Sequence, residues 1–396
     1  MIDYSKVINK ATHDMKPSGI RKFFDVAATM EGAISLGVGE PDFQTPWPIR
    51  RAAITALERG KTFYTANAGL AKLREEISDY VFKNTQVRYD PANEIIVTVG
   101  GSEAIDLSIR AMVEPGDEVL VVEPSFVCYK PIVELCGGTP VVIETKSEDS
   151  FKLQADTLKE KITPRTKALV LPYPNNPTGA IMTREDLSAI AEVLKDTNIV
   201  ILTDEIYSEL TYGRKHTSII ELDGMRERTV YINGFSKGFA MTGWRLGYLC
   251  GPKEIVSQIL KIHQYAIMSS PTVSQYAAIE GLASCLSDVK MMVEEYDMRR
   301  RYLVDGFNKL GLDCFTPEGA FYVFPSIKST GLSSLDFCEK LLFTKKVAVV
   351  PGDAFGKCGE GFIRVSYAYS LKHLKIALKC IGEFLKELKN EGSTNA

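Results

Sequence analysis

The sequence predicts an α/β protein with a mostly parallel sheet in a large domain, helices on both faces of that sheet, and a smaller α/β domain. Three observations lead to this prediction. Short apolar runs typical of buried strands alternate with segments of helical periodicity between residues 94 and 250. Several of these runs pass directly into turn residues and polar side chains, as at 100–103, 173–179 and 204–207. After a long helical stretch at 287–310, further strand-like runs follow. Strands that alternate with helices are typical of parallel sheets covered by helices.

The elements of the larger domain are expected to follow one another with short connections. A glycine turn, Gly100-Gly101, joins the first strongly apolar strand to a helix. The predicted elements up to residue 250 are a helix at 20–30, a strand at 34–39, helices at 48–59 and 70–83, a strand at 94–99, a helix ending near 112, a strand at 119–122, a helix beginning at 124–129, strands at 139–143 and 167–172, a helix at 184–195, and strands at 199–203, 229–232 and 246–250.

The chain is expected to divide into two domains. Residues 45–286 would form the larger one, and residues 1–44 and 287–396 the smaller one. The run Arg299-Arg300-Arg301 is interpreted as a solvated helix face, and the tail from residue 390 as disordered. The strands predicted for the smaller domain are at 321–324, 347–350 and 362–367.

Composition and charge argue against several classes of partner. Hydrophobic residues make up 45% of the 396-residue chain and charged residues 24%, as in an ordinary soluble globular protein. The net charge of −3 gives no electrostatic reason to expect nucleic acid or an anionic membrane as a partner. No apolar run is long enough to span a bilayer, and the N-terminal stretch lacks the apolar core of a signal peptide. We therefore expect a cytoplasmic protein.

Neither the cysteines nor the histidines are spaced like metal ligands. The eight cysteines contain no Cys-x-x-Cys pair and lie in apolar or mixed segments, so we expect buried free thiols. The four histidines are far apart in the sequence and have no cysteine or aspartate at ligand spacing. No metal site is expected.

One lysine has unusual neighbours. Lys237 lies within Asn233-Gly-Phe-Ser-Lys-Gly-Phe-Ala-Met-Thr-Gly-Trp-Arg245, among small and aromatic residues. Partial desolvation there would disfavour the charged ammonium and leave a better nucleophile, as a Schiff base with an aldehyde cofactor requires. Arg245 would be able to hold an anionic group of the same cofactor. The alternative is a buried turn whose lysine extends to water.

Polar residues also follow several predicted strands. Asn176, Asp204 and Lys237 each come just after a strand, and ligands of parallel sheets bind at the carboxyl ends of the strands. The turn at Gly100-Gly101 opens a helix, whose free N–H groups form an anion site. One ligand would be able to contact all of these groups.

Five short motifs follow one another along the chain: Gly39-Glu-Pro-Asp, Asn175-Asn-Pro-Thr-Gly179, Asp204-Glu-Ile-Tyr207, Ser236-Lys237 and Trp244-Arg245-Leu-Gly. In this order and spacing they resemble the motif set of the class I aminotransferases, which are pyridoxal-phosphate enzymes of the aspartate aminotransferase fold. The resemblance runs over nearly the whole chain and ends at Arg364-Val-Ser-Tyr. It implies fold type I of the pyridoxal-phosphate-dependent transferases and pyridoxal 5′-phosphate as cofactor.

The resemblance implies roles for residues around the cofactor ring. Lys237 would bind the cofactor aldehyde covalently and then act as general base and acid. Asp204 would pair with the pyridinium nitrogen and keep it protonated, while Tyr207 and Asn176 would hydrogen-bond the 3′ oxygen of the ring. Phe126 would stack on the ring, at a position where many aspartate-specific members have tryptophan.

The resemblance also implies residues for the phosphate and for a partner subunit. Backbone N–H groups of Gly101, Ser102 and Glu103 would bind the phosphate, together with two side chains, Ser236 and Arg245. Tyr64 would reach the phosphate of the neighbouring subunit, which implies a homodimer with shared sites; otherwise it is an ordinary loop tyrosine.

For the substrate, the resemblance implies that Arg364 clamps the α-carboxylate, with help from Asn176 and the N–H of Gly39. Dicarboxylate-specific relatives carry an arginine near the start of the segment that begins at His263, but no lysine or arginine occurs here between residues 262 and 289. Aspartate specificity is therefore in doubt. The candidates for the side-chain pocket are Ile20, Phe23, Tyr129, Lys130 and Tyr322, each of which is alternatively a packing residue.

The function implied is transfer of an amino group between an L-amino acid and a 2-oxo acid. Two short segments, Ser18-Gly-Ile-Arg-Lys-Phe and His263-Gln-Tyr, resemble those of bacterial aminotransferases that act on aspartate, aromatic or N-acetyl-diaminopimelate-type substrates. A C–S β-lyase of the same fold would share Lys237, Asp204 and Arg364 and stays open as an alternative. A regulatory cofactor-binding domain would need a basic DNA-binding segment, which the sequence lacks.

Overall fold

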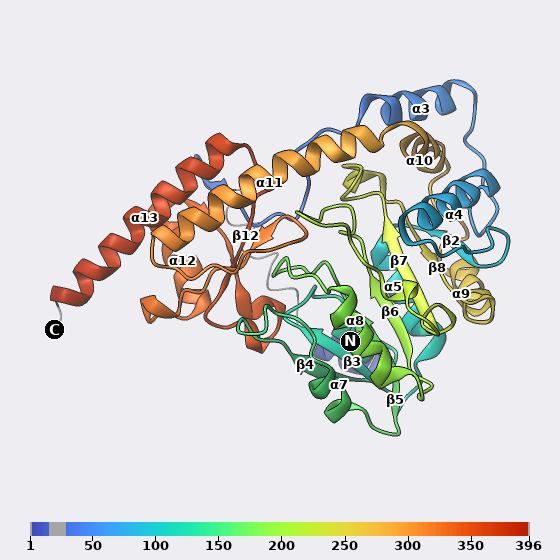
Figure 1. Cartoon of the computed structure of the whole chain (residues 1–396), viewed down its shortest axis with the longest axis horizontal. Helices are drawn as coiled ribbons and strands as arrows, with labels where there is room; N and C mark the ends of the chain where they lie inside the picture. The colour runs from blue at the N-terminus through green and yellow to red at the C-terminus, as the bar shows by residue number, and fades with distance from the viewer. Residues whose placement is uncertain (1, 16–28, 395–396) are drawn as a thin grey trace.

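The computed structural model of the protein describes residues 2–15 and 29–394, and side chains up to residue 390 (Figure 1). Most of the helix predicted at 20–30 falls outside these residues, as do the pocket candidates Ile20 and Phe23.

The largest sheet has seven strands, in the order β2-β8-β7-β6-β5-β3-β4. The ladder from β7 through β6, β5 and β3 to β4 is parallel, whereas β8 runs antiparallel to both β2 and β7. The prediction of a mostly parallel sheet is therefore confirmed. The strands are β2 (Ile95–Thr98), β3 (Glu118–Glu123), β4 (Thr139–Glu144), β5 (Thr166–Leu171), β6 (Val200–Asp204), β7 (Thr229–Gly234) and β8 (Gly247–Cys250).

Both faces of this sheet are buried, which explains why its strands read as continuous apolar runs. In β5, Leu169 and Leu171 pack into one core, whereas Ala168 and Val170 pack into a second core on the opposite face. Helices cover both faces (Figure 1). The helices before and beside the sheet are α1 (Lys10–Asp14), α3 (Trp47–Glu58), α4 (Ala71–Thr85), α5 (Gly101–Met112), α6 (Tyr129–Leu135), α7 (Ala155–Lys161), α8 (Arg184–Leu194), α9 (Lys253–Ala266) and α10 (Thr272–Ser284).

Local sequence signals set several helix ends. At the start of α8, the Thr183 side chain accepts from the Asp186 N–H while the Asp186 carboxylate accepts from the Thr183 N–H, which is a capping box. Ser333 caps α12 through the N–H of Asp336. Gly100, with a φ of +80°, makes the turn from β2 into α5.

The remaining strands form two small sheets that join the two ends of the chain. β1 pairs in parallel with β10, and β12 lies between β11 and β9 with antiparallel pairing on both sides. The long helix α11 extends from beside α10 toward these strands (Figure 1). Division of the chain at residues 45 and 286 stays a prediction. The elements of this part are β1 (Ile34–Ser35), α11 (Leu286–Lys309), β9 (Tyr322–Val323), α12 (Ser334–Lys345), β10 (Val347–Ala348), β11 (Val350–Pro351), β12 (Ile363–Ser366) and α13 (Leu371–Thr394).

Two expectations about the C-terminal part are wrong. The arginine run on α11 is not a solvated face, because Arg299 is only 5% exposed and binds both carboxylate oxygens of Asp42, at 2.8 and 2.9 Å. Arg300 is also shielded and donates to the Pro317 carbonyl, so only Arg301 lies in solvent. The predicted disorder from residue 390 is likewise wrong as far as Thr394, where α13 ends.

The eight cysteines are all free thiols, as expected. Four of them are buried and four are only partly buried, so the expectation of burial holds for half of them. Among the described residues, no helix is both long and apolar enough to cross a membrane.

Candidate active site

A cavity of about 320 Å³ opens where the carboxyl ends of β5, β6 and β7 meet the first turn of α5. Chain segments from the C-terminal part and from the start of the chain close its other side. Its lining residues are Gly39, Gly101, Ser102, Ile105, Phe126, Tyr129, Pro172, Pro174, Asn176, Asp204, Ile206, Tyr207, Ser236, Lys237, Thr242, Arg245, Tyr322 and Arg364. Eleven of the thirteen sequence-predicted site residues are in this set, and Tyr64 and Glu103 are not.

Lys237 follows β7 and directs its amine into the cavity, where Nζ donates to the carbonyl oxygen of Gly39 at 2.7 Å. The rings of Tyr207 and Phe321 lie 5.9 Å from this nitrogen. Burial lowers the pKa of Lys237 to about 8, and the positive charges of Arg364 and Arg245 act in the same direction. A substantial fraction of the amine is therefore neutral and nucleophilic near pH 8.

The turn around Lys237 requires backbone conformations that most residues avoid. Arg245 has a φ of +52°, and its guanidinium Nη1 donates to the Thr242 carbonyl at 3.1 Å. Gly100 approaches this guanidinium so closely that a side chain at residue 100 would collide with it. The two segments that carry Gly100 and Arg245 therefore meet at one end of the cavity.

Asp204 is the last residue of β6 and is buried at the cavity wall. The hydroxyl of Tyr129 donates to its Oδ2 at 2.7 Å, and the N–H of Ile206 donates to its Oδ1 at 3.3 Å. Burial raises the pKa of Asp204, while the Tyr129 hydrogen bond opposes that rise. A cationic ring nitrogen placed against this carboxylate would stabilise its ionised form.

The end of the cavity near α5 is suited to an anion. Gly101 and Ser102 begin a twelve-residue helix, and Ser236 and Arg245 line the same cavity. The Glu103 side chain turns elsewhere: its carboxylate accepts from the Val99 N–H, and its Oε1 lies 2.8 Å from His263 Nδ1. Only the backbone of Glu103 is therefore left to serve an anion in the cavity.

A buried guanidinium lies at the opposite end. Arg364, on β12, is 3% exposed; its Nη1 donates to Asn176 Oδ1 at 2.9 Å and its Nη2 to the Gly37 carbonyl. It stacks over the rings of Tyr322 and Phe355, at 4.4 and 4.7 Å. Its Nε has no partner among the described residues, and no carboxylate among them pairs with it. A buried cation of this kind fits a carboxylate ligand.

Aromatic side chains complete the walls. The hydroxyls of Tyr207 and Tyr322 lie 2.9 Å apart, and a side chain at Gly39 would collide with the Tyr322 hydroxyl. Phe126 packs edge-on against Tyr129, with ring centroids 6.1 Å apart. Of the pocket candidates, Tyr129 and Tyr322 line the cavity, whereas Lys130 does not and instead pairs with Glu123.

One predicted site residue lies away from the cavity, and one hydrogen bond at the cavity wall was not predicted. Tyr64 is 81% exposed on the loop between α3 and α4, away from the lining of this cavity. The bond from Tyr129 to Asp204 was not predicted, because its two residues are 75 positions apart. No local pattern signals this bond, because Tyr129 is the first residue of α6 and its partner is the last residue of β6.

This donor and acceptor set fits pyridoxal phosphate. A nucleophilic amine, a carboxylate, an anion-binding helix start and a buried arginine surround one cavity whose walls include aromatic rings. The amine suits an aldehyde, the carboxylate suits a protonated ring nitrogen, and the helix start suits a phosphate. Arg364 is left to bind the carboxylate of a second molecule, such as a substrate.

Comparisons with known proteins agree in family and differ in substrate. The family model "Aminotransferase class I and II" matches residues 31–381. The Bacillus subtilis "Probable N-acetyl-LL-diaminopimelate aminotransferase" is 45% identical over 94% of this chain and 94% of its own length. The aspartate aminotransferase of Pyrococcus abyssi is 45% identical over 95% of this chain and 97% of its own length. The crystal structure of an aromatic aminotransferase from Pyrococcus horikoshii OT3 superposes with a TM-score of 0.89 at 42% identity, covering 94% of this chain and 100% of that one.

Proposed function

The chain belongs to the class I and II aminotransferases, which depend on pyridoxal phosphate, and from this we propose that Lys237 is the catalytic residue of its amino-group transfer. The enzyme moves an amino group between an amino acid and a 2-oxo acid. One observation carries the assignment of Lys237: its amine, with the pKa lowered to about 8, lies in the same cavity as Asp204 and Arg364. An amine that changes charge near neutral pH is able both to accept and to return a proton.

Bound pyridoxal phosphate supplies an aldehyde carbon and an aromatic ring that accepts electrons from the substrate Cα. The chain's own residues would do the rest. Asp204 would hold the proton on the ring nitrogen, and Tyr129 would keep the carboxylate in place. Tyr207 and Asn176 would hydrogen-bond the 3′ oxygen of the ring, and Phe126 would stack on its face.

Arg364 would orient the substrate. Its Nη1 is already held by Asn176, and its free Nε faces no protein acceptor among the described residues. Together with the N–H of Gly39, it would fix the α-carboxylate, and so place the Cα–H where the Lys237 amine is able to remove the proton. Gly101, Ser102, Glu103, Ser236 and Arg245 would bind the phosphate at the other end.

We propose substrates of the aspartate, glutamate, aromatic or diaminopimelate type. The names of the relatives support the aspartate, aromatic and N-acetyl-diaminopimelate types. The described cations that line the cavity are Lys237, Arg245 and Arg364, and each already has a proposed role. No further cation in the described lining of one chain is available for a second carboxylate, which favours the aromatic type among these substrates.

We also propose a cytoplasmic homodimer with shared sites. Tyr64 would contact the phosphate bound by the neighbouring subunit, a role consistent with its exposure on a loop. Phe63, next to it, is equally exposed, so this loop presents two aromatic side chains to a partner.

A half-reaction tests the proposed chemistry. The enzyme loaded with pyridoxal phosphate is mixed with one amino acid and no oxo acid, over a panel of amino acids. An aminotransferase converts the bound cofactor to its pyridoxamine form and releases the matching 2-oxo acid in a single turnover. Release of pyruvate and ammonia over many turnovers would contradict the proposal and indicate a β-lyase. Lys237→Arg is the control and should give neither result.

A further inference from the structure

The segment from Asp204 to Tyr207 has two faces. Asp204, Ile206 and Tyr207 line the cavity. Glu205 does not line it and is 1% exposed, with its backbone N–H donating to the Ile232 carbonyl of β7 at 2.8 Å. The carboxylate of Glu205 is therefore buried behind the residues that face the cofactor.

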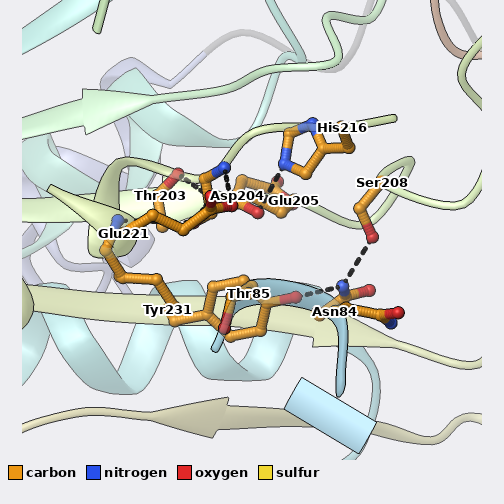
Figure 2. A network of polar contacts seen from close by, with 12 residues as sticks. Asn84, Thr85, Thr203, Asp204, Glu205, Ser208, His216, Glu221 and Tyr231 are labelled. Carbon is orange, nitrogen blue, oxygen red and sulfur yellow. Dashed lines mark hydrogen bonds and ion pairs between the residues drawn. The ribbon is translucent and has the colours of Figure 1, made fainter. Parts of the chain in front are cut away.

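Three side chains meet at the Glu205 carboxylate. The hydroxyls of Thr203 and Ser218 donate to Oε1 at 2.9 and 2.5 Å, and Nε2 of His216 lies 2.6 Å from Oε2. Figure 2 shows the imidazole of His216 directed at this carboxylate. Ser218 and His216 belong to the segment that leads from Tyr207 into the next 3₁₀ helix, so Glu205 ties the two ends of that segment together.

The charged groups around the Glu205–His216 contact set the pKa of His216. Burial lowers the pKa of His216, but the adjacent Glu205 outweighs burial and the pKa lies above its ordinary value. The other charged groups acting on this region are Glu221, Glu209 and Lys215. Among the described side chains, the partly buried His216 is the one that pairs with Glu205, at 2.6 Å, so its imidazolium would compensate the Glu205 carboxylate.

We propose that Glu205 and His216 form a positioning pair, which holds the 204–207 segment from behind so that Asp204 and Tyr207 keep their places against the cofactor. The inference rests on the proposed roles of Asp204 and Tyr207. Neither Glu205 nor His216 touches the cavity, so both act through their neighbours.

The two members of the pair differ in what their loss leaves behind. Glu205→Gln removes the negative charge, lets His216 become neutral, and still allows a hydrogen bond between the two side chains. His216→Gln leaves a buried carboxylate uncompensated beside Asp204, which raises the proton affinity of Asp204 and weakens its hold on a cationic ring nitrogen. A merely structural pair would show this asymmetry in the stability of the fold but not in the affinity for pyridoxal phosphate.

The first measurement uses the protein without cofactor. NMR titration of the four histidines should give His216 a midpoint above 6.5, the signal being assigned by its absence from His216→Gln. In Glu205→Gln the midpoint should fall. A midpoint below 6.5 in the wild type overturns the inference, even if a variant does not fold.

The second measurement is the dissociation constant of pyridoxal phosphate, followed by absorbance. His216→Gln should weaken binding about tenfold, Glu205→Gln clearly less, and the double variant should match Glu205→Gln. Equal weakening in both single variants, or none, overturns the positioning pair. If the wild type itself forms no borohydride-stable adduct at Lys237, it is the proposed function that fails.

Discussion

The surroundings of Asp204 suit the cationic partner that we propose for it. Burial alone would favour the neutral acid, and the 2.7 Å bond from Tyr129 opposes this effect without adding charge. The carboxylate is thus held at a fixed position, with its proton affinity still raised. A protonated ring nitrogen at this wall would complete the pair.

The predicted consequence is a graded loss on substitution. Asp204→Asn keeps the shape but removes the charge, so the rate of the half-reaction should fall about 100-fold or more, because a charge-assisted hydrogen bond is lost. Tyr129→Phe removes only a neutral donor and should cost about tenfold. Stopped-flow absorbance checks both rates. Equal effects of the two substitutions would argue against Asp204 as the ring partner.

At this scale the sequence indicated which polar residues gather, but not all of their contacts. Asn176, Asp204 and Lys237 lie on one cavity, as expected from their positions just after parallel strands. The burial of Arg299 was missed because its partner Asp42 is 257 positions away, and local periodicity carries no signal for such a pair.

At the scale of elements, a buried arginine in the middle of α11 fixes this helix to a segment near the start of the chain. Arg299 reaches across to both oxygens of Asp42 and to Glu295 on its own helix, and it lies 5.3 Å from the ring of Phe43. Asp42 belongs to the Gly39-Glu-Pro-Asp motif, so this contact connects the long helix to the segment whose Gly39 carbonyl binds Lys237.

Breaking this contact should destabilise the protein. Arg299→Ala leaves the Asp42 carboxylate without its main partner and removes a packed side chain, which predicts a loss of about 3 kcal/mol. Arg301→Ala, on the exposed side of the same helix, should change stability by less than about 0.5 kcal/mol. Urea unfolding of both variants measures the difference. Equal stability of the two would show that the buried pair contributes nothing.

Most element positions followed from periodicity, because strands buried on both faces and amphipathic helices have distinct patterns. The predictions for the short strands of the small sheets were less exact. The run predicted at 347–350 is two strands, β10 and β11, with different partners. Partner choice depends on segments such as β1, more than 300 positions away, and a local pattern does not record it.

At the scale of the whole molecule, the lowered pKa of Lys237 has a cost in stability. In the unfolded chain this lysine has an ordinary pKa of about 10.4, whereas in the folded chain its pKa is about 8. Between these pH values the unfolded state binds more protons, so this lysine makes stability rise with pH. Below pH 8 its cost is fully present, and above about 10.4 the cost is gone.

The cofactor-free protein provides the test. Lys237→Met should be more stable than the wild type at pH 7, by up to about 3 kcal/mol from this source, and the difference should shrink as the pH rises through 8 to 10. Denaturant unfolding at several pH values measures it. A difference that does not change with pH would show that Lys237 is not desolvated in the folded protein.

The most direct test of the central claim is to locate the covalent bond between cofactor and protein. Wild-type protein is loaded with pyridoxal phosphate, reduced with borohydride, digested and analysed by mass spectrometry, with Lys237→Arg treated in parallel. The account predicts one reduced pyridoxyl group per chain, on Lys237, and none in the variant. A label on another lysine, or equal labelling of both proteins, would contradict it.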